Sequence, residues 1–206
     1  MPLEIVHYFA PMSGYAYLGV AALEDLAERH GCVVKHAPVD IQAVFAASGV
    51  TPPAIQSDTK KAYRRADMRR WADLRALPLR EAPKHWPAPG APAARYILAA
   101  ETVAERGGAM SRAVLSACWA RDLDIADETV LTSLAEEVGL DPEKTRETAA
   151  GDVVGRLAES LTADAIRLGL FGSPTYVIGD RIFFGQDRLD FLERDIVARQ
   201  SGTKLA

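Results

Sequence analysis

Cysteine and histidine are scarce in this chain, which has two cysteines and four histidines among 206 residues. Cys32 and Cys118 lie far apart, and neither belongs to a Cys-x-x-Cys motif. The histidines do not have the spacing of metal ligands. The sequence therefore supports neither a zinc site nor dithiol redox chemistry, and we expect no bound metal.

Long apolar runs and a strong net charge are also absent. No window reaches the roughly 18 apolar residues of a membrane span, and the N-terminal residues lack the basic and apolar segments of a signal peptide. The net charge of −4 argues against nucleic acid as a partner, because phosphate-binding proteins carry a concentrated basic face. We expect a cytoplasmic protein that binds neither nucleic acid nor membranes.

The composition is that of an ordinary globular protein, with 49% apolar and 25% charged residues. One stretch is rich in basic residues, but Asp58, Asp67 and Asp73 are interleaved with them, so a solvated helix face is the better interpretation. The basic residues of this stretch are Lys60, Lys61, Arg64, Arg65, Arg69 and Arg70.

The first forty residues have the pattern of a β-α-β unit. Leu3–Phe9 is rich in β-branched and aromatic residues and predicts a strand. Gly14–Arg29 has an apolar stripe at helical spacing, and Gly31 stands where a helix often ends. Cys32–Val39 predicts a second strand, and a helical crossover of this kind normally joins parallel strands.

Helical patterns dominate from 40 to 168, with proline-rich joints at 51–53 and 82–92, and strand patterns return after Gly169. The predicted helices of the middle segment are Lys60–Arg75, Ala93–Arg106, Met110–Asp122, Asp127–Val138, Glu143–Ala149 and Gly151–Leu168. The predicted C-terminal elements are the strands Thr175–Ile178 and Arg181–Phe184, joined by a Gly179–Asp180 hairpin turn, and a helix over Arg188–Arg199.

The element order is therefore β-α-β, a large all-helical insertion, then β-β-α, which defines an α/β fold. We expect one discontinuous domain made of residues 1–40 and 169–206. Residues 41–168 are expected to form a helical domain inserted into it.

Ser13 lies at the joint between the first strand and the first helix. The N-terminus of a helix has unpaired N–H groups and a partial positive charge, which favour an anion and lower the pKa of a thiol placed there. Serine is also a favoured N-cap residue, and position alone favours that structural role over a functional one.

Two further stretches are candidates for binding an extended ligand. Ser173–Pro174 is a candidate cis peptide at the start of a strand, where Ser173 can offer its N–H and C=O to a peptide; the alternative is a proline that only begins an edge strand. Asp187 is either the N-cap of the last helix or, with the N–H groups of that helix, a site for the ammonium and carboxylate groups of a ligand.

Together these stretches resemble the 2-hydroxychromene-2-carboxylate isomerases over nearly the whole chain. The resemblance implies a thioredoxin-like fold of the type found in DsbA and the kappa-class glutathione transferases, with a large helical insertion, and a homodimer. It also implies glutathione as the cofactor and a small aromatic α-keto or hydroxy acid as the substrate. The matching segments are Tyr8–Leu18, Lys60–Ala72, Phe171–Thr175 and Phe184–Leu192.

The resemblance implies a glutathione site residue by residue. Ser13 matches the serine whose hydroxyl holds the glutathione sulfur, and it is the implied catalytic residue. Ser173 matches the residue before a cis-proline, here Pro174, and pairs its backbone with the tripeptide. Gln186 and Asp187 match the pair that receives the γ-glutamyl end.

The implied substrate residues are Lys60, which in the family lies near both glutathione and the acidic substrate, and Trp86, an aromatic residue in the second proline-rich joint. Ala10, Gly14 and Val50 depart from the family pattern, which has aspartate, proline and often asparagine at these positions. The missing asparagine leaves the exact substrate open.

The activity that the resemblance implies is the isomerisation of 2-hydroxychromene-2-carboxylate to trans-o-hydroxybenzylidenepyruvate, or of a related intermediate of aromatic degradation. A glutathione transferase that uses the same site is one alternative. A non-catalytic DsbA-like binding protein is another. A disulfide oxidoreductase is disfavoured, because residue 13 is serine and no second cysteine lies nearby.

Overall fold

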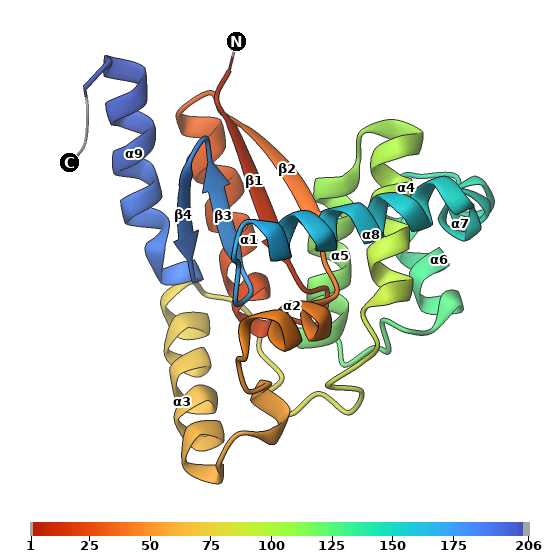
Figure 1. Cartoon of the computed structure of the whole chain (residues 1–206). Helices are drawn as coiled ribbons and strands as arrows, with labels where there is room; N and C mark the ends of the chain where they lie inside the picture. The colour runs from red at the N-terminus through yellow and green to blue at the C-terminus, as the bar shows by residue number, and fades with distance from the viewer. Residues whose placement is uncertain (1, 204–206) are drawn as a thin grey trace.

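The computed structural model describes residues 2–203 and has a four-stranded sheet at its centre, with helices on both faces (Figure 1). The strand order is β2-β1-β3-β4. The strands are β1 (Glu4–Phe9), β2 (Val33–Pro38), β3 (Thr175–Ile178) and β4 (Arg181–Phe184). All four predicted strands are confirmed, and β3 and β4 have the predicted bounds.

The strand pairing brings two distant joints of the chain together. β1 and β2 are parallel, with Glu4 opposite Val33, because a helix connects them as a crossover. β1 and β3 are antiparallel, with Tyr8 opposite Thr175, and β3 continues into β4 as a hairpin. The C-terminal end of β1 and the N-terminal end of β3 therefore lie at the same end of the sheet.

The helices follow the predicted pattern with one addition, α2, which the sequence pattern did not predict. Asp40 caps α2, and Gly49 ends it with a left-handed backbone at φ 72°. No helix among residues 2–203 is long and apolar enough to cross a membrane. The helices are α1 (Gly14–Arg29), α2 (Ile41–Ser48), α3 (Asp58–Leu74), α4 (Ala91–Ala104), α5 (Gly107–Trp119), α6 (Glu128–Glu137), α7 (Pro142–Ala150), α8 (Asp152–Arg167) and α9 (Leu189–Ser201), with short 3-10 turns η1 (Pro53–Ile55) and η2 (Gln186–Arg188).

Alternating side chains of β1 belong to cores on opposite faces of the sheet. Ile5 packs with Leu23 of α1 and Leu192 of α9 on one face. Tyr8 packs with Leu161 of α8 on the other face, in front of the sheet in Figure 1. This alternation is what a strand buried on both faces requires.

A third core cluster joins the β-α-β unit to the inserted helices. Phe9 of β1 and Leu18 of α1 belong to it, together with Ile97, Leu115 and Trp119 of α4 and α5. The predicted division into residues 1–40 with 169–206 and residues 41–168 stays a prediction, and this shared core lies across it.

A buried histidine lies on β1 at the centre of the sheet. His7 is 0% exposed, its ring stacks on Phe9, and its Nδ1 lies 3.2 Å from Nδ1 of His36. Nε2 of His36 in turn lies 3.5 Å from Glu24. Burial, and next the charge of His36, lower the pKa of His7 well below its ordinary value, so His7 is neutral in the folded protein.

This histidine gives the folded protein a pH-dependent stability. The unfolded chain takes up a proton at His7 below about pH 6.5 and the folded chain resists it, so the free energy of unfolding falls below that pH, by up to about 1.4 kcal/mol per pH unit. We expect Tm to fall less between pH 7 and pH 5 in His7→Phe than in the wild type. His85→Gln changes an exposed histidine whose Nδ1 lies 3.5 Å from Asp124, and its Tm should follow the wild-type curve closely, because an exposed pair of this kind contributes little. Parallel Tm curves for all three proteins would contradict the prediction.

Candidate active site

Ser13 lies at the N-terminus of α1, at the end of the sheet where β1 ends. Its Oγ accepts a hydrogen bond from the Ala16 N–H at 3.2 Å, which confirms the N-cap. The same hydroxyl donates to the Ser173 carbonyl oxygen at 3.3 Å. The structure thus joins two predicted site residues that are 160 positions apart in the sequence.

The Ser173–Pro174 peptide bond is cis, as predicted. The Ser173 Oγ accepts a hydrogen bond from the Ala10 N–H at 2.9 Å, which holds this joint against the loop that follows β1. The Ser173 main-chain N–H has no acceptor among residues 2–203. Gly172 precedes it because a Cβ at that position would overlap the Phe184 ring.

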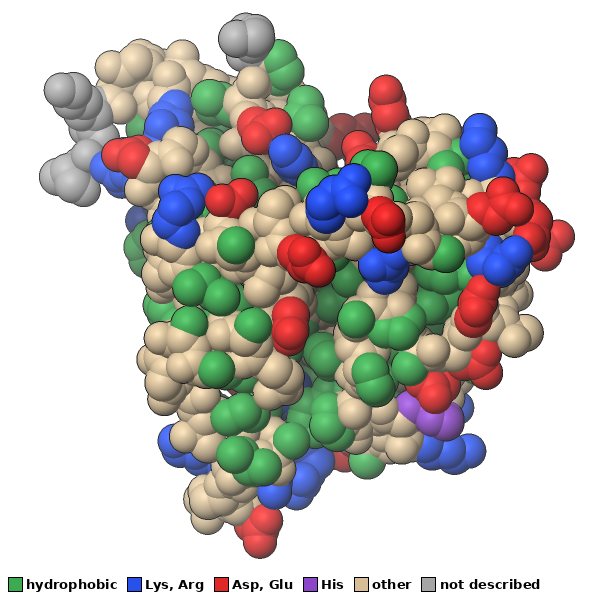
Figure 2. Space-filling view, turned by 45° about the vertical axis from the view of Figure 1, so that its right-hand side comes forward, with side chains coloured by type: hydrophobic (Ala, Val, Ile, Leu, Met, Phe, Trp, Pro, Cys, Tyr) green, Lys and Arg blue, Asp and Glu red, His purple; other side chains and the backbone are tan. Residues whose placement is uncertain are grey.

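A cavity of about 660 Å³ opens beside Ser13 and Ser173, within the usual size range of small-molecule sites. Figure 2 shows hydrophobic side chains gathered in the lower part of the molecule, where α2 and α3 lie. Lys60 and Trp86 also line the cavity, whereas Pro174 does not. The apolar lining residues include Ile41, Phe45, Pro52, Phe171 and Phe184.

Two tryptophans fix the loop that carries Ser13. Nε1 of Trp86 and Nε1 of Trp119 each donate a hydrogen bond to the Met12 carbonyl oxygen, both at 3.1 Å. Their rings lie 6.0 Å apart between centroids. Trp86 was predicted from the sequence, but Trp119 at the end of α5 was not, because a buried tryptophan in a helix has the same pattern as any core residue.

The basic residues of α3 do not all lie on a solvated face, contrary to the prediction from the sequence. α3 carries the basic stretch, and most of its basic side chains are exposed, but Arg64 turns inward and lines the cavity. Nearby, the Tyr15 hydroxyl donates to Asp67 at 2.9 Å, and burial together with this hydrogen bond raises the pKa of Tyr15. The prediction of a solvated face is therefore wrong for Arg64, which sequence reasoning missed as a site residue.

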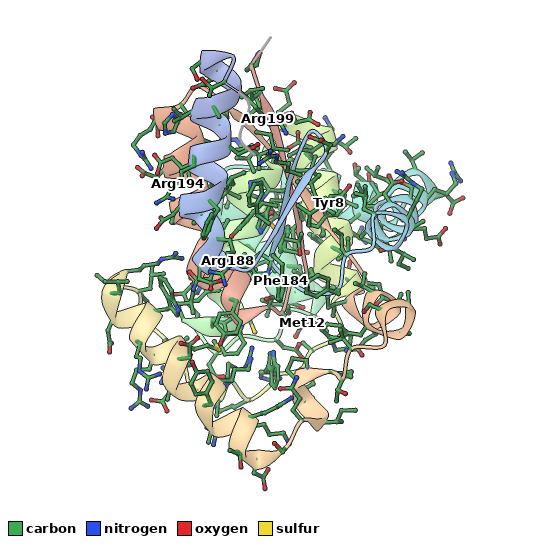
Figure 3. The ribbon with its side chains drawn as sticks, turned by 60° about the vertical axis from the view of Figure 1, so that its left-hand side comes forward. Tyr8, Met12, Phe184, Arg188, Arg194 and Arg199 are labelled. Carbon is green, nitrogen blue, oxygen red and sulfur yellow. The ribbon has the colours of Figure 1, made fainter. Side chains whose placement is uncertain are left out.

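Gln186 and Asp187 lie in η2 and do not line the cavity. The Gln186 side chain is 2% exposed, and its Oε1 has no hydrogen-bond partner in the described chain. Asp187 is exposed beside Arg188, and no side chain caps α9, so the alternative role of Asp187 as N-cap is wrong. Figure 3 shows Arg188, Phe184 and Met12 at the same end of the sheet.

The departures from the family pattern have structural counterparts. A Cβ on Gly14 would overlap the Met68 side chain and lie 2.9 Å from Trp119, so the close approach of α1 to α3 and α5 requires glycine. Ala10 is buried, and its N–H serves the hydrogen bond to Ser173 described above. Val50 lines the cavity, where it adds apolar surface in place of an amide.

Comparison with known proteins agrees with this architecture. Residues 4–197 match the family model of the DSBA-like thioredoxin domain. The chain is therefore a member of the DSBA-like thioredoxin-domain proteins.

Comparison with individual proteins identifies a narrower family within this class. The chain is 34% identical to a 2-hydroxychromene-2-carboxylate isomerase of Sphingobium xenophagum, over 94% of this chain and 97% of that protein. It is 27% identical to a protein of the same name from Pseudomonas putida, over 90% of each chain. A solved structure of a 2-hydroxychromene-2-carboxylate isomerase superposes with a TM-score of 0.83 at 26% identity, over 97% of this chain and 98% of that one. Within the DSBA-like class, the chain belongs to the 2-hydroxychromene-2-carboxylate isomerase family.

Proposed function

We propose that this protein is a glutathione-dependent isomerase of 2-hydroxychromene-2-carboxylate or a closely related aromatic keto acid. The observation that carries the proposal is the meeting of Ser13 and Ser173 at the wall of an apolar cavity that also contains basic side chains. The names of the relatives support the same reaction. A cytoplasmic location and a homodimer are part of this proposal.

The chain offers groups that fit glutathione. The Ser173 N–H has no acceptor among residues 2–203, and an extended tripeptide can pair with it. The first N–H groups of a helix lack partners within that helix, so the start of η2 and α9 suits the γ-glutamyl carboxylate. The buried Gln186 would contribute its main chain, and the exposed Asp187 would accept from the ammonium group.

The side chains then have separate tasks. Bound glutathione would supply a thiolate nucleophile for reversible addition to the conjugated double bond, and it would not be consumed. Ser13 would donate its hydroxyl hydrogen to that thiolate at the N-terminus of α1, in place of its hydrogen bond to the Ser173 carbonyl oxygen. Trp86 and the apolar walls hold the aromatic ring and exclude water, and Lys60 attracts the substrate carboxylate.

A glutathione transferase is the second candidate, since it would use the same site. Product analysis separates the two, because an isomerase leaves total glutathione unchanged and forms no conjugate. Disulfide chemistry is disfavoured by the cysteines themselves. Cys118 is buried, and burial raises the pKa of its thiol to about 12. Neither Cys118 nor Cys32 lines the cavity.

Glutathione binding is the direct test of the proposal. We expect glutathione at about 100 times its dissociation constant to raise the free energy of unfolding by roughly 2.7 kcal/mol, with a matching rise in Tm. S-methylglutathione, which keeps both carboxylates and the ammonium group, should also stabilise the protein but should support no turnover. An unchanged Tm at millimolar glutathione would count against the proposed function as a whole.

A further inference from the structure

Arg64 has an unusual environment for an arginine on a surface helix. Its guanidinium carbon lies 5.5 Å from the centroid of the Tyr15 ring, 5.0 Å from that of Trp86 and 5.6 Å from that of Trp119. These rings come from α1, the proline-rich joint and α5, so three separate segments converge on one cation. The half-buried side chain lines the same cavity as Ser13.

Among residues 2–203, Arg64 makes no hydrogen bond or ion pair. Two of its basic neighbours on α3 have acidic partners: Lys61 lies 3.9 Å from Asp58, and Arg69 pairs with Glu81. The other three, Lys60, Arg65 and Arg70, have no ion pair in the described chain, but they are exposed to water, whereas Arg64 is half-buried. The Tyr15 hydroxyl already donates to Asp67, the nearby acid on α3. Burial lowers the pKa of the Arg64 guanidinium, which nevertheless stays protonated. Aromatic faces offset only part of the cost of a desolvated cation.

Lys60 is the other cation on this side of the cavity, one helical turn before Arg64. Lys60 is exposed, so water and salt screen its charge. Arg64 is partly shielded from water and presents a planar fork of donors, which matches the two oxygens of a carboxylate better than an ammonium group does. The aromatic rings around Arg64 also suit a flat, conjugated body next to that carboxylate.

We propose that Arg64, rather than Lys60, holds the substrate carboxylate and selects planar aromatic acids over neutral compounds of the same shape. The identity of the physiological substrate rests on the proposed isomerase function, but the preference of this cavity for a carboxylate does not. Arg64 would act as a specificity residue, and Lys60 would draw the anion to the entrance.

The test measures binding, without glutathione and without turnover. Isothermal titration calorimetry of the full-length protein with trans-cinnamate and with cinnamamide compares two planar aryl compounds that differ in charge. We expect the wild type to bind cinnamate at least tenfold more tightly. Arg64→Gln should weaken cinnamate binding about 10- to 100-fold and leave cinnamamide within about twofold, the range expected for charge-assisted hydrogen bonds. The cinnamate affinity of Arg64→Lys should lie between those of the wild type and Arg64→Gln.

The matched control is Arg65→Gln, an exposed arginine of the same helix that does not line the cavity, and it should bind both probes like the wild type. Lys60→Gln should weaken cinnamate less than Arg64→Gln does. Equal affinity of the wild type for the two probes would overturn the inference. So would an Arg64→Gln variant, with a wild-type Tm, that loses glutathione affinity but keeps cinnamate affinity. If glutathione fails to bind while the cinnamate preference depends on Arg64, the proposed function fails and this inference stands.

Discussion

Ser13→Ala is expected to lower the rate of isomerisation about 10- to 150-fold while lowering the free energy of unfolding by only about 1 kcal/mol. The two effects come from different bonds. As the N-cap, the Ser13 Oγ accepts from Ala16, and losing this bond affects only the stability of α1. As a donor to a thiolate, it makes a charge-assisted bond worth roughly 1.5–3 kcal/mol, and each 1.36 kcal/mol is tenfold in rate.

The measurement compares turnover of 2-hydroxychromene-2-carboxylate with denaturant unfolding of the same variant. Asp141→Ala is the matched control, because Asp141 caps α7 through its bond to the Lys144 N–H and does not line the cavity. It should lose about the same stability and keep the wild-type rate. The thiol pKa of bound glutathione, followed by thiolate absorbance, should rise in Ser13→Ala. A variant that loses about 1 kcal/mol of stability but turns over normally would reduce Ser13 to a helix cap.

Ser13 and Ser173 were predictable because local sequence signals mark both. A serine between a predicted strand and a predicted apolar helix is expected at the N-terminus of that helix. A proline within a strand pattern is expected at the start of the strand. The strands and helices of the β-α-β and β-β-α segments were also predictable from local patterns. The pairing of β1 with β3 then places Ser13 and Ser173 at the same end of the sheet. α2 was missed although Asp40 and Gly49, its two end signals, were present, because its eight residues are too few for a clear period.

The burial of Arg64 and of Gln186 was beyond sequence reasoning for a different reason, although Gln186 itself was a predicted site residue. The helical period of α3 is charged on more than one face, so nothing local separates Arg64 from its exposed neighbours. Its burial depends on Trp86 and Trp119, which lie 22 and 55 positions later. Gln186 is buried because η2 packs on α1, where a Cβ on Gly19 would lie 2.7 Å from Cβ of Gln186. Tertiary packing decides both cases.

Trp119→Ala is expected to lower the free energy of unfolding by about 3–5 kcal/mol, the usual cost of removing a fully buried tryptophan. Trp119 is 1% exposed and belongs to the core that joins α1 to the inserted helices. Removing it opens a void beside Gly14 and takes away one of the three rings around Arg64. The variant should therefore lose stability and cinnamate affinity together, whereas Ser13→Ala separates stability from activity.

Trp119→Phe separates the contribution of ring packing to the free energy of unfolding from that of the hydrogen bond. It keeps an aromatic ring but loses the donor to the Met12 carbonyl oxygen, which still accepts from Trp86 at 3.1 Å. Because that carbonyl oxygen keeps a partner, the lost hydrogen bond should cost only about 1 kcal/mol, with a further small cost for the reduced ring volume. Denaturant unfolding of both variants measures the division. If Trp119→Ala lost less than Trp119→Phe, or if neither variant changed the free energy of unfolding, the inserted helices would not support the Ser13 loop through this residue. A large loss in Trp119→Ala with a small one in Trp119→Phe would instead indicate that the packing of the Trp119 ring stabilises this region more than its hydrogen bond to Met12 does.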